Sequence, residues 1–309
     1  TPERIMTYLA SPALSRALGD DPLLRDSILD RLPHSESPAA RAAVEIALYD
    51  LWGQALGQPL FRLWGLNPAR IPNSSFTIAM SDDMTAYRQL VRRAAKTFKL
   101  VKLKLGSGDW QHDLNLVQLA REECSVDLCV DANGAWSVEE SCAIIPQLAT
   151  LGIRFIEQPV AHNDIEGWRV LHKTLPVMHP PLIADESVQG VESIFPLAGI
   201  VDGVNVKLAK CGGLRAARQM IALARAFGMK VLIGCMVESS VAVTAAAHLA
   251  PLADYADLDG NLLITNDPYR GLTIKNGHIV LPNTPGLGVA LYQENNQEKN
   301  QAKNQEKNG

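Results

Sequence analysis

The sequence lacks the features that define several classes of protein. Its 309 residues include only five cysteines, and none has the short Cys-x-x-Cys spacing of a zinc site, which argues against a zinc or disulfide framework. No apolar run approaches the roughly 20 residues that a membrane-spanning helix needs. The first residues show no basic segment followed by an apolar one, so no signal peptide is predicted. We therefore expect a cytoplasmic protein with no membrane partner.

Excess positive charge is also lacking. Lys and Arg number 29 against 33 Asp and Glu, which gives a net charge of -4 and argues against a nucleic-acid partner. Neither a GxGxxG nor a GxxxxGK motif is present, so a nucleotide site is not predicted. The 47% hydrophobic and 20% charged content is that of an ordinary globular protein.

The first zone of the chain, up to about residue 70, is predicted to be helical. Amphipathic patterns predict helices over 2–18 and 21–32. Ser37 followed by Pro38 is a helix-start signal, and it opens a longer helix that we expect to end near Gly57.

The second zone, about 74–260, alternates short apolar runs with segments of helical period. Eight strands are predicted, over 75–80, 100–105, 126–132, 153–158, 182–186, 203–208, 230–235 and 255–259. The predicted intervening helices include 83–96, 109–122, 138–148, 164–173, 214–227 and 241–249. A helix following a strand seven times indicates an α/β fold with parallel strands, closed into a (β/α) barrel.

The third zone begins with a pair of strands within 262–281. The Asn276-Gly277 dipeptide predicts a hairpin turn between them. Beyond residue 292 the chain is polar and repetitive, and 293–309 is predicted to be a low-complexity, solvated tail.

Polar residues recur near the predicted strand ends at intervals of about 22–28 residues, the length of one βα unit. They are Thr77, Lys104, Asp131, Glu157, Asp185, Lys207, Cys235 and Asp257. A single strand-end carboxylate could be a helix cap, but a set that keeps the period of the barrel predicts an active site on its carboxyl-terminal rim.

Asp131, Glu157 and Asp185 end three consecutive strands. Three hard oxygen ligands at one point favour Mg²⁺ over zinc or copper. Lys104 and Lys207 end strands two and six of eight, so a closed barrel places them across its mouth. This arrangement suits α-proton removal from one face of a substrate and reprotonation on the other, through a metal-stabilised enediolate. Each lysine would need a lowered pKa.

Lys102 lies two residues before Lys104, so strand alternation places both on one face. We expect Lys102 to contact the substrate carboxylate. Glu186 and Lys210 do not fall at the regular interval of the strand-end residues. We expect them to contact the site residues rather than the substrate, or to begin helices.

Several motifs together resemble the enolase superfamily and, within it, the muconate lactonizing enzyme subgroup. They are KLK at 102–104, DANGAW at 131–136, IEQP at 156–159, ADES at 184–187, VKLAKCGG at 206–213 and the helix AARAAVEIALYDLWGQALGQPL at 39–60. The resemblance implies a modified (β/α)7β TIM-type barrel with Mg²⁺ on Asp131, Glu157 and Asp185. It also implies acid/base roles for Lys104 and Lys207.

The resemblance further implies a division of the chain. Residues 1–72 would be a partial, mostly helical capping domain, 73–260 the catalytic barrel and 261–292 strands that return to the cap. Members of this family have further N-terminal residues that carry a strand-rich part of the cap and a lid loop. We therefore expect that lid to be missing here, and activity to be weak or broad.

The eighth predicted strand indicates which class of substrate the site binds. Asp257 and Asp259 lie on one strand face, where two carboxylates favour a cationic group such as a dipeptide's amino terminus. The ADLDGNLL segment is similar to the Asp-x-Asp motif of dipeptide epimerases, which implies inversion at the C-terminal residue of a dipeptide. L-Ala-D/L-Glu, from cell-wall peptides, is the best-known substrate. Thr77 is a further substrate-binding candidate.

Two alternatives remain open. An N-acylamino acid racemase or a muconate-type cycloisomerase would use the same lysines and carboxylates. A catalytically silent barrel could instead bind a peptide or act as an oligomer scaffold. Relatives are often multimeric, so a homo-oligomer is compatible with the sequence, which does not fix the oligomeric state.

Overall fold

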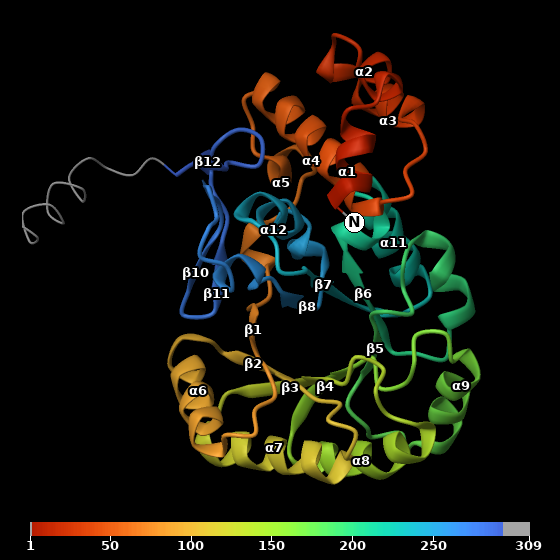
Figure 1. The fold of residues 1–309 in the computed structure, drawn as a ribbon, viewed down its shortest axis with the longest axis vertical. Helices are drawn as coiled ribbons and strands as arrows, with labels where there is room; N and C mark the ends of the chain where they lie inside the picture. The colour runs from red at the N-terminus through yellow and green to blue at the C-terminus, as the bar shows by residue number, and fades with distance from the viewer. Residues whose placement is uncertain (1, 293–309) are drawn as a thin grey trace, which may run out of the picture.

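The computed structural model describes residues 2–292, and its centre is an eight-stranded parallel barrel (Figure 1). The strands pair in chain order: β1 Ser75–Ile78, β2 Leu100–Lys104, β3 Asp127–Asp131, β4 Ile153–Glu157, β5 Leu182–Ala184, β6 Gly203–Lys207, β7 Lys230–Gly234 and β8 Tyr255–Asp257. A parallel bridge between Ser74 and Ala256 joins the last strand to the first. The predicted barrel and all eight strands are confirmed.

Helices cover the outside of the barrel (Figure 1). They are α6 Met84–Thr97, α7 Trp110–Glu123, α8 Val138–Thr150, α9 Ile165–Thr174, α10 Leu208–Cys211, α11 Leu214–Ala226 and α12 Ser240–Ala247. The connection after β5 is instead a 3₁₀ helix, η3 Val191–Leu197, so the prediction of a helix after each of seven strands is wrong there. Pro196 lies inside this segment and has no N–H for an α-helical hydrogen bond.

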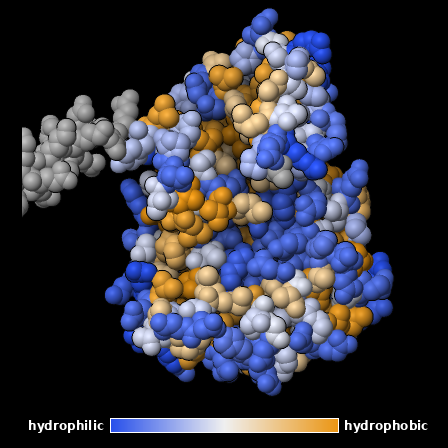
Figure 2. All heavy atoms as spheres, viewed as in Figure 1, coloured by the Kyte–Doolittle hydropathy of each residue, from blue (hydrophilic) through white to orange (hydrophobic). Residues whose placement is uncertain are grey.

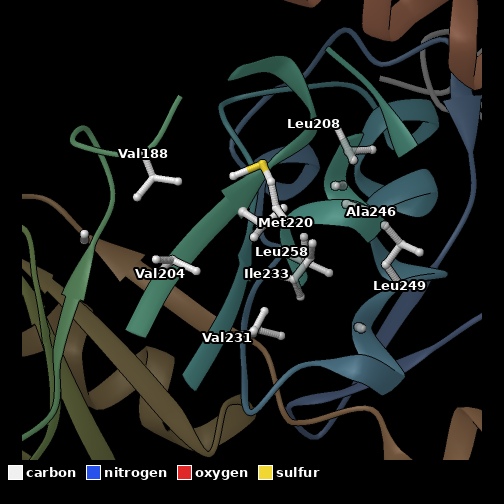
Figure 3. Close-up of a cluster of buried hydrophobic side chains, with 14 of the residues drawn as sticks. Val188, Val204, Leu208, Met220, Val231, Ile233, Ala246, Leu249 and Leu258 are labelled. Carbon is white, nitrogen blue, oxygen red and sulfur yellow. The ribbon is translucent and has the colours of Figure 1, made fainter. Parts of the chain in front are cut away.

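Alternation along the strands separates two cores. Residues that point outward, such as Val204, Val231 and Ile233, pack against the surrounding helices (Figure 3). Residues that point inward form a separate apolar cluster inside the barrel: Leu100, Cys129, Phe155, Ile183, Leu232 and Tyr255. The next inward positions, two residues further along several strands, carry the polar side chains of the site.

The N-terminal helices pack over one side of the barrel (Figure 1). They are α1 Pro2–Leu9, α2 Pro12–Leu18, α3 Arg25–Arg31, α4 Pro38–Ala55 and α5 Leu60–Leu63, with the 3₁₀ helix η1 Pro22–Leu24 before α3. The single helix predicted over 2–18 is wrong, because Ser11 caps a new helix that has Pro12 at its first position. Ser37 caps α4 as predicted, and the buried Glu45 of α4 accepts a hydrogen bond from the Arg215 backbone at the start of α11.

The C-terminal strands lie beside these helices (Figure 1). β10 Thr273–Lys275 and β11 His278–Val280 form the predicted hairpin, while β9 Tyr269–Arg270 pairs with β12 Ala290–Leu291. The Ser74 N–H donates to Gly277 O at 3.0 Å, which fixes the hairpin to the start of β1. The Leu60 N–H donates to Gly286 O at 3.1 Å, so the same segment reaches α5.

The division at residues 72, 260 and 292 stays a prediction, and the predicted tail at 293–309 lies outside the described residues. On the face shown in Figure 2, exposed hydrophobic side chains lie in separate patches between hydrophilic ones. Within residues 2–292, no helix combines the length and apolar content needed to cross a membrane. The same part of the chain contains all five cysteines, and all are free thiols.

Candidate active site

The predicted rim residues meet at one pocket of about 360 Å³, at the carboxyl ends of the strands. Its lining includes Thr77, Lys102, Lys104, Asp185, Lys207, Cys235, Asp257 and Asp259. Asp131 and Glu157 are fully buried just beneath it, where they contact the lysines of the lining. The structure thus brings together every residue that the sequence placed in the site.

The carboxylates of Asp131, Glu157 and Asp185 form a buried acidic triad. One oxygen from each lies within 4.8 Å of the others. Asp131 and Glu157 end β3 and β4, and Asp185 follows β5, so three neighbouring strands fix the triad. Three hard carboxylate oxygens at this separation fit a Mg²⁺ ion with positions left for substrate.

Lys102 lies at the centre of the acidic residues and is almost fully buried. Its Nζ is 2.9 Å from Asp131 Oδ2, 2.7 Å from Glu157 Oε2 and 2.8 Å from Asp257 Oδ2. Burial disfavours its charged form, but Asp131, Asp257 and Glu157 outweigh burial and hold the pKa of Lys102 well above its usual value. Lys102 is therefore a fixed positive charge at the base of the pocket.

Lys104 and Lys207 enter the pocket from β2 and β6, which three strands separate on either side of the barrel. Lys104 Nζ lies 2.7 Å from Asp131 Oδ2, and Lys207 Nζ lies 2.7 Å from Asp185 Oδ2. The sequence predicted that burial and a nearby cation would lower the lysine pKa values, and without the metal ion this lowering is not seen at Lys207. Burial lowers its pKa, but the charges of Asp185 and Glu157 raise it above its ordinary value.

The members of the triad differ in their electrostatic surroundings. Burial, together with Asp131, raises the pKa of Glu157 to about 8, although Lys102 opposes the shift. Burial would also raise the pKa of Asp185, but Lys207 and Lys210 hold it below its usual range. Lys210 contacts both the carboxylate and the backbone carbonyl of Asp185, so it lies closer to the triad than the sequence indicated.

Asp257 and Asp259 both line the pocket as predicted, although β8 ends at Asp257 and Asp259 lies beyond it, at the start of the 3₁₀ helix η5 Gly260–Leu262. The two carboxylates have different partners. Asp257 accepts hydrogen bonds from Lys102 and, at 2.5 Å, from the Ser75 hydroxyl. Asp259 accepts from the Thr77 N–H at 2.7 Å. Burial and the charge of Asp257 raise the pKa of Asp259 to about 6. Asp259 is therefore the better placed of the two for a substrate ammonium group, because Lys102 already neutralises Asp257.

Sequence reasoning missed three polar residues of the site. Asn205 Nδ2 donates to Glu157 Oε1 at 2.8 Å, and Ser75 holds Asp257. Asn133 accepts from Lys104 Nζ at 2.9 Å and donates to Glu186 Oε1 at 2.8 Å. Strand alternation gave a signal for Asn205, which precedes Lys207 by two residues just as Lys102 precedes Lys104.

Comparison with known proteins identifies the family. The family model described as enolase C-terminal domain-like matches residues 86–295. The chain belongs to this family. An L-Ala-D/L-Glu epimerase of Bacteroides thetaiotaomicron is 39% identical over 295 residues, which are 94% of this chain and 74% of that protein.

Solved structures of this enolase-like family have the same fold. A dipeptide epimerase of Enterococcus faecalis, complexed with Mg and the dipeptide L-Leu-L-Tyr, superposes with a TM-score of 0.83 at 29% identity, covering 94% of this chain and 82% of that one. An N-succinyl Arg/Lys racemase of Bacillus cereus superposes with a TM-score of 0.85 at 27% identity, covering 96% and 82%. The fold is therefore common to members that act on different amino-acid derivatives.

Proposed function

We propose that this chain epimerises dipeptides in a Mg²⁺-dependent reaction that inverts the α-carbon of the C-terminal residue. The observation that carries the proposal is that one pocket is lined by two lysines from opposite strands and lies directly over a buried acidic triad. A lysine on each side of the substrate allows removal of the α-proton from one face and its return to the other. Asp131, Glu157 and Asp185 would hold the metal ion.

The chain's own residues perform the proton transfers in this proposal. Lys104 removes or supplies the α-proton on one face of the α-carbon, and Lys207 does so on the other. Lys102 stays protonated and places a positive charge at the base of the pocket. When held by Asp131, Glu157 and Asp185, Mg²⁺ would supply positive charge that binds the substrate carboxylate, stabilises the negative charge that develops on it and favours the neutral form of a lysine acting as a base.

The substrate class follows from the opposite wall of the pocket. Asp259 offers a carboxylate that can pair with an ammonium group, which a dipeptide has and an N-acyl amino acid lacks. The name of the Bacteroides relative makes L-Ala-D/L-Glu the first dipeptide to test. N-acylamino acid racemisation is the second candidate, because the B. cereus racemase superposes equally well.

The test is deuterium uptake at the α-carbon in D₂O with Mg²⁺, read by mass spectrometry and proton NMR on a panel of dipeptides and N-succinyl amino acids. We expect uptake with inversion in dipeptides. Lys104→Ala and Lys207→Ala should each abolish inversion. In each variant the remaining lysine should still exchange the α-proton of the epimer whose proton faces it, so the two variants should retain exchange in different epimers. Exchange of N-succinyl amino acids alone would establish the racemase, and no exchange in any compound would refute both.

A further inference from the structure

Asn133 bridges Lys104 and Glu186 at the rim of the pocket. Its Oδ1 accepts from Lys104 Nζ at 2.9 Å, and its Nδ2 donates to Glu186 Oε1 at 2.8 Å. Asn133 follows β3 and Glu186 follows β5, so the bridge crosses the strand that carries Glu157. It contains no member of the acidic triad.

The backbone holds Asn133 in place for this contact. Its φ of 47° lies in the left-handed region, which asparagine tolerates better than most residues. The Asn133 N–H donates to Asp131 Oδ1 at 2.9 Å, which fixes the turn after β3. Because Glu186 accepts from the amide nitrogen, the amide oxygen must face Lys104.

The contact to Asn133 differs in kind from the other contact of Lys104. The second acceptor of the Lys104 ammonium is Asp131 Oδ2 at 2.7 Å, and the Asp131 carboxylate is one that the metal ion would also use. The neutral amide oxygen of Asn133 can orient the amine without that competition. Lys207 has a different environment, since its hydrogen-bonding partner within residues 2–292 is the carboxylate of Asp185.

We propose that Asn133, oriented by Glu186, is a positioning residue for Lys104 and therefore acts on one face of the substrate only. This inference rests on the proposed function, because it assigns a role to one of the two proton-transferring lysines. Within residues 2–292, the Asn133 side chain hydrogen-bonds to Lys104 and Glu186 and not to Lys207, Asp257 or Asp259, so its loss should affect one face of the substrate.

Asn133→Gly tests the proposal, since glycine adopts the positive φ without strain and removes only the side chain. The readout is α-proton exchange with solvent, measured separately for each epimer of one dipeptide. We expect exchange to fall roughly 10–100-fold in the epimer that Lys104→Ala also silences, because small misplacement of a catalytic group has effects of this size. Exchange of the other epimer should stay within about twofold of the wild type.

Two further variants supply the controls. Asn276→Gly removes another asparagine of positive φ, at 52°, from the distant β10–β11 hairpin, and it should leave both exchange rates unchanged. Glu186→Gln retains an oxygen that can accept from Asn133, so its α-proton exchange rate should fall less than that of Glu186→Ala. In both variants the fall should occur in the epimer that depends on Lys104.

An equal loss in both epimers of Asn133→Gly would overturn the proposal, since it would indicate damage to the shared metal site or to the fold. If wild-type protein exchanges no substrate at all, the proposed function fails instead. The positioning role would then be decided by a crystal structure of Asn133→Gly. A Lys104 Nζ displaced from its wild-type position would support the role, and an undisplaced Nζ would refute it.

Discussion

Lys102 Nζ lies 2.8 Å from Asp257 Oδ2, so a buried lysine of β2 joins β8 to the acidic triad. This ion pair explains why two aspartates that line the same pocket have unequal roles. Asp257 completes a charge cluster inside the barrel, while Asp259 faces the pocket without a lysine partner among the described residues.

Replacing Lys102 should strongly destabilise the protein. Lys102→Met leaves Asp131, Glu157 and Asp257 buried without their shared cation, and removing one partner of a buried ion pair typically costs about 3–5 kcal/mol. Thermal unfolding in EDTA and in Mg²⁺ would measure this. Mg²⁺ should raise the melting temperature more in the variant than in the wild type, and an unchanged melting temperature in EDTA would contradict the assignment.

Asp259 should set an acidic limb in the pH profile for dipeptides. Its pKa of about 6 means that it gains its negative charge as pH rises through 6, and only the charged form attracts a substrate ammonium. We expect kcat/KM for dipeptides to rise across that range. In Asp259→Asn this rise should disappear and kcat/KM at pH 8 should fall by at least about tenfold, since a charge-assisted hydrogen bond is lost. A limb that persists in the variant would assign it to another group.

Asn205 should tune Mg²⁺ affinity through Glu157. Both side chains are fully buried, and the amide donates to Glu157 Oε1 at 2.8 Å. Asn205→Leu removes that donor, and the dissociation constant for Mg²⁺ measured by calorimetry should rise roughly 10–100-fold, as for other residues that orient metal ligands. Asn261→Leu is the control, because the Asn261 amide donates to the Ser240 hydroxyl rather than to a carboxylate. Equal affinities in both variants would refute the role.

His248 should make stability depend on pH. The ring is buried, its Nδ1 accepts from the Phe61 N–H at 3.2 Å, and its Nε2 lies 3.1 Å from Leu287 O. Burial lowers its pKa to about 4, so the unfolded chain binds a proton more readily. The free energy of unfolding should therefore fall by roughly 3 kcal/mol as pH drops from 6.5 to 4.

Urea unfolding at several pH values would measure the His248 effect. His248→Asn should be less stable than the wild type at pH 7, and it should show a smaller fall in the free energy of unfolding between pH 6.5 and 4. A fall of the same size in both proteins would place the titration elsewhere.

The barrel was predictable from sequence because parallel, fully buried strands read as short apolar runs at a regular spacing. The same spacing located Lys104, Asp131, Glu157, Asp185 and Lys207, since each ends or follows a strand. The break at Ser11 was missed although Ser-Pro marks it, the same signal that correctly located the start of α4. Amphipathic periodicity continued across the break and hid it.

The remaining features depend on tertiary contacts that no local pattern encodes. The raised pKa of Lys207 arises from Asp185 and Glu157, which are 22 and 50 residues away in the chain. The pairing of Asn133 with Glu186 likewise depends on how two loops meet at the rim. Composition and periodicity place such residues on elements, but the distances between their polar atoms decide their protonation and partners.

The hydrogen bonds from Ser74 to Gly277 and from Leu60 to Gly286 also constrain biosynthesis. The start of the first barrel strand and the last α-helix before it, α5, rely on residues that the ribosome adds more than 200 positions later. Contacts so distant in sequence slow folding, because long loops must close first. The contact of α5 with Gly286 must therefore wait until the segment that follows the β10–β11 hairpin has left the exit tunnel.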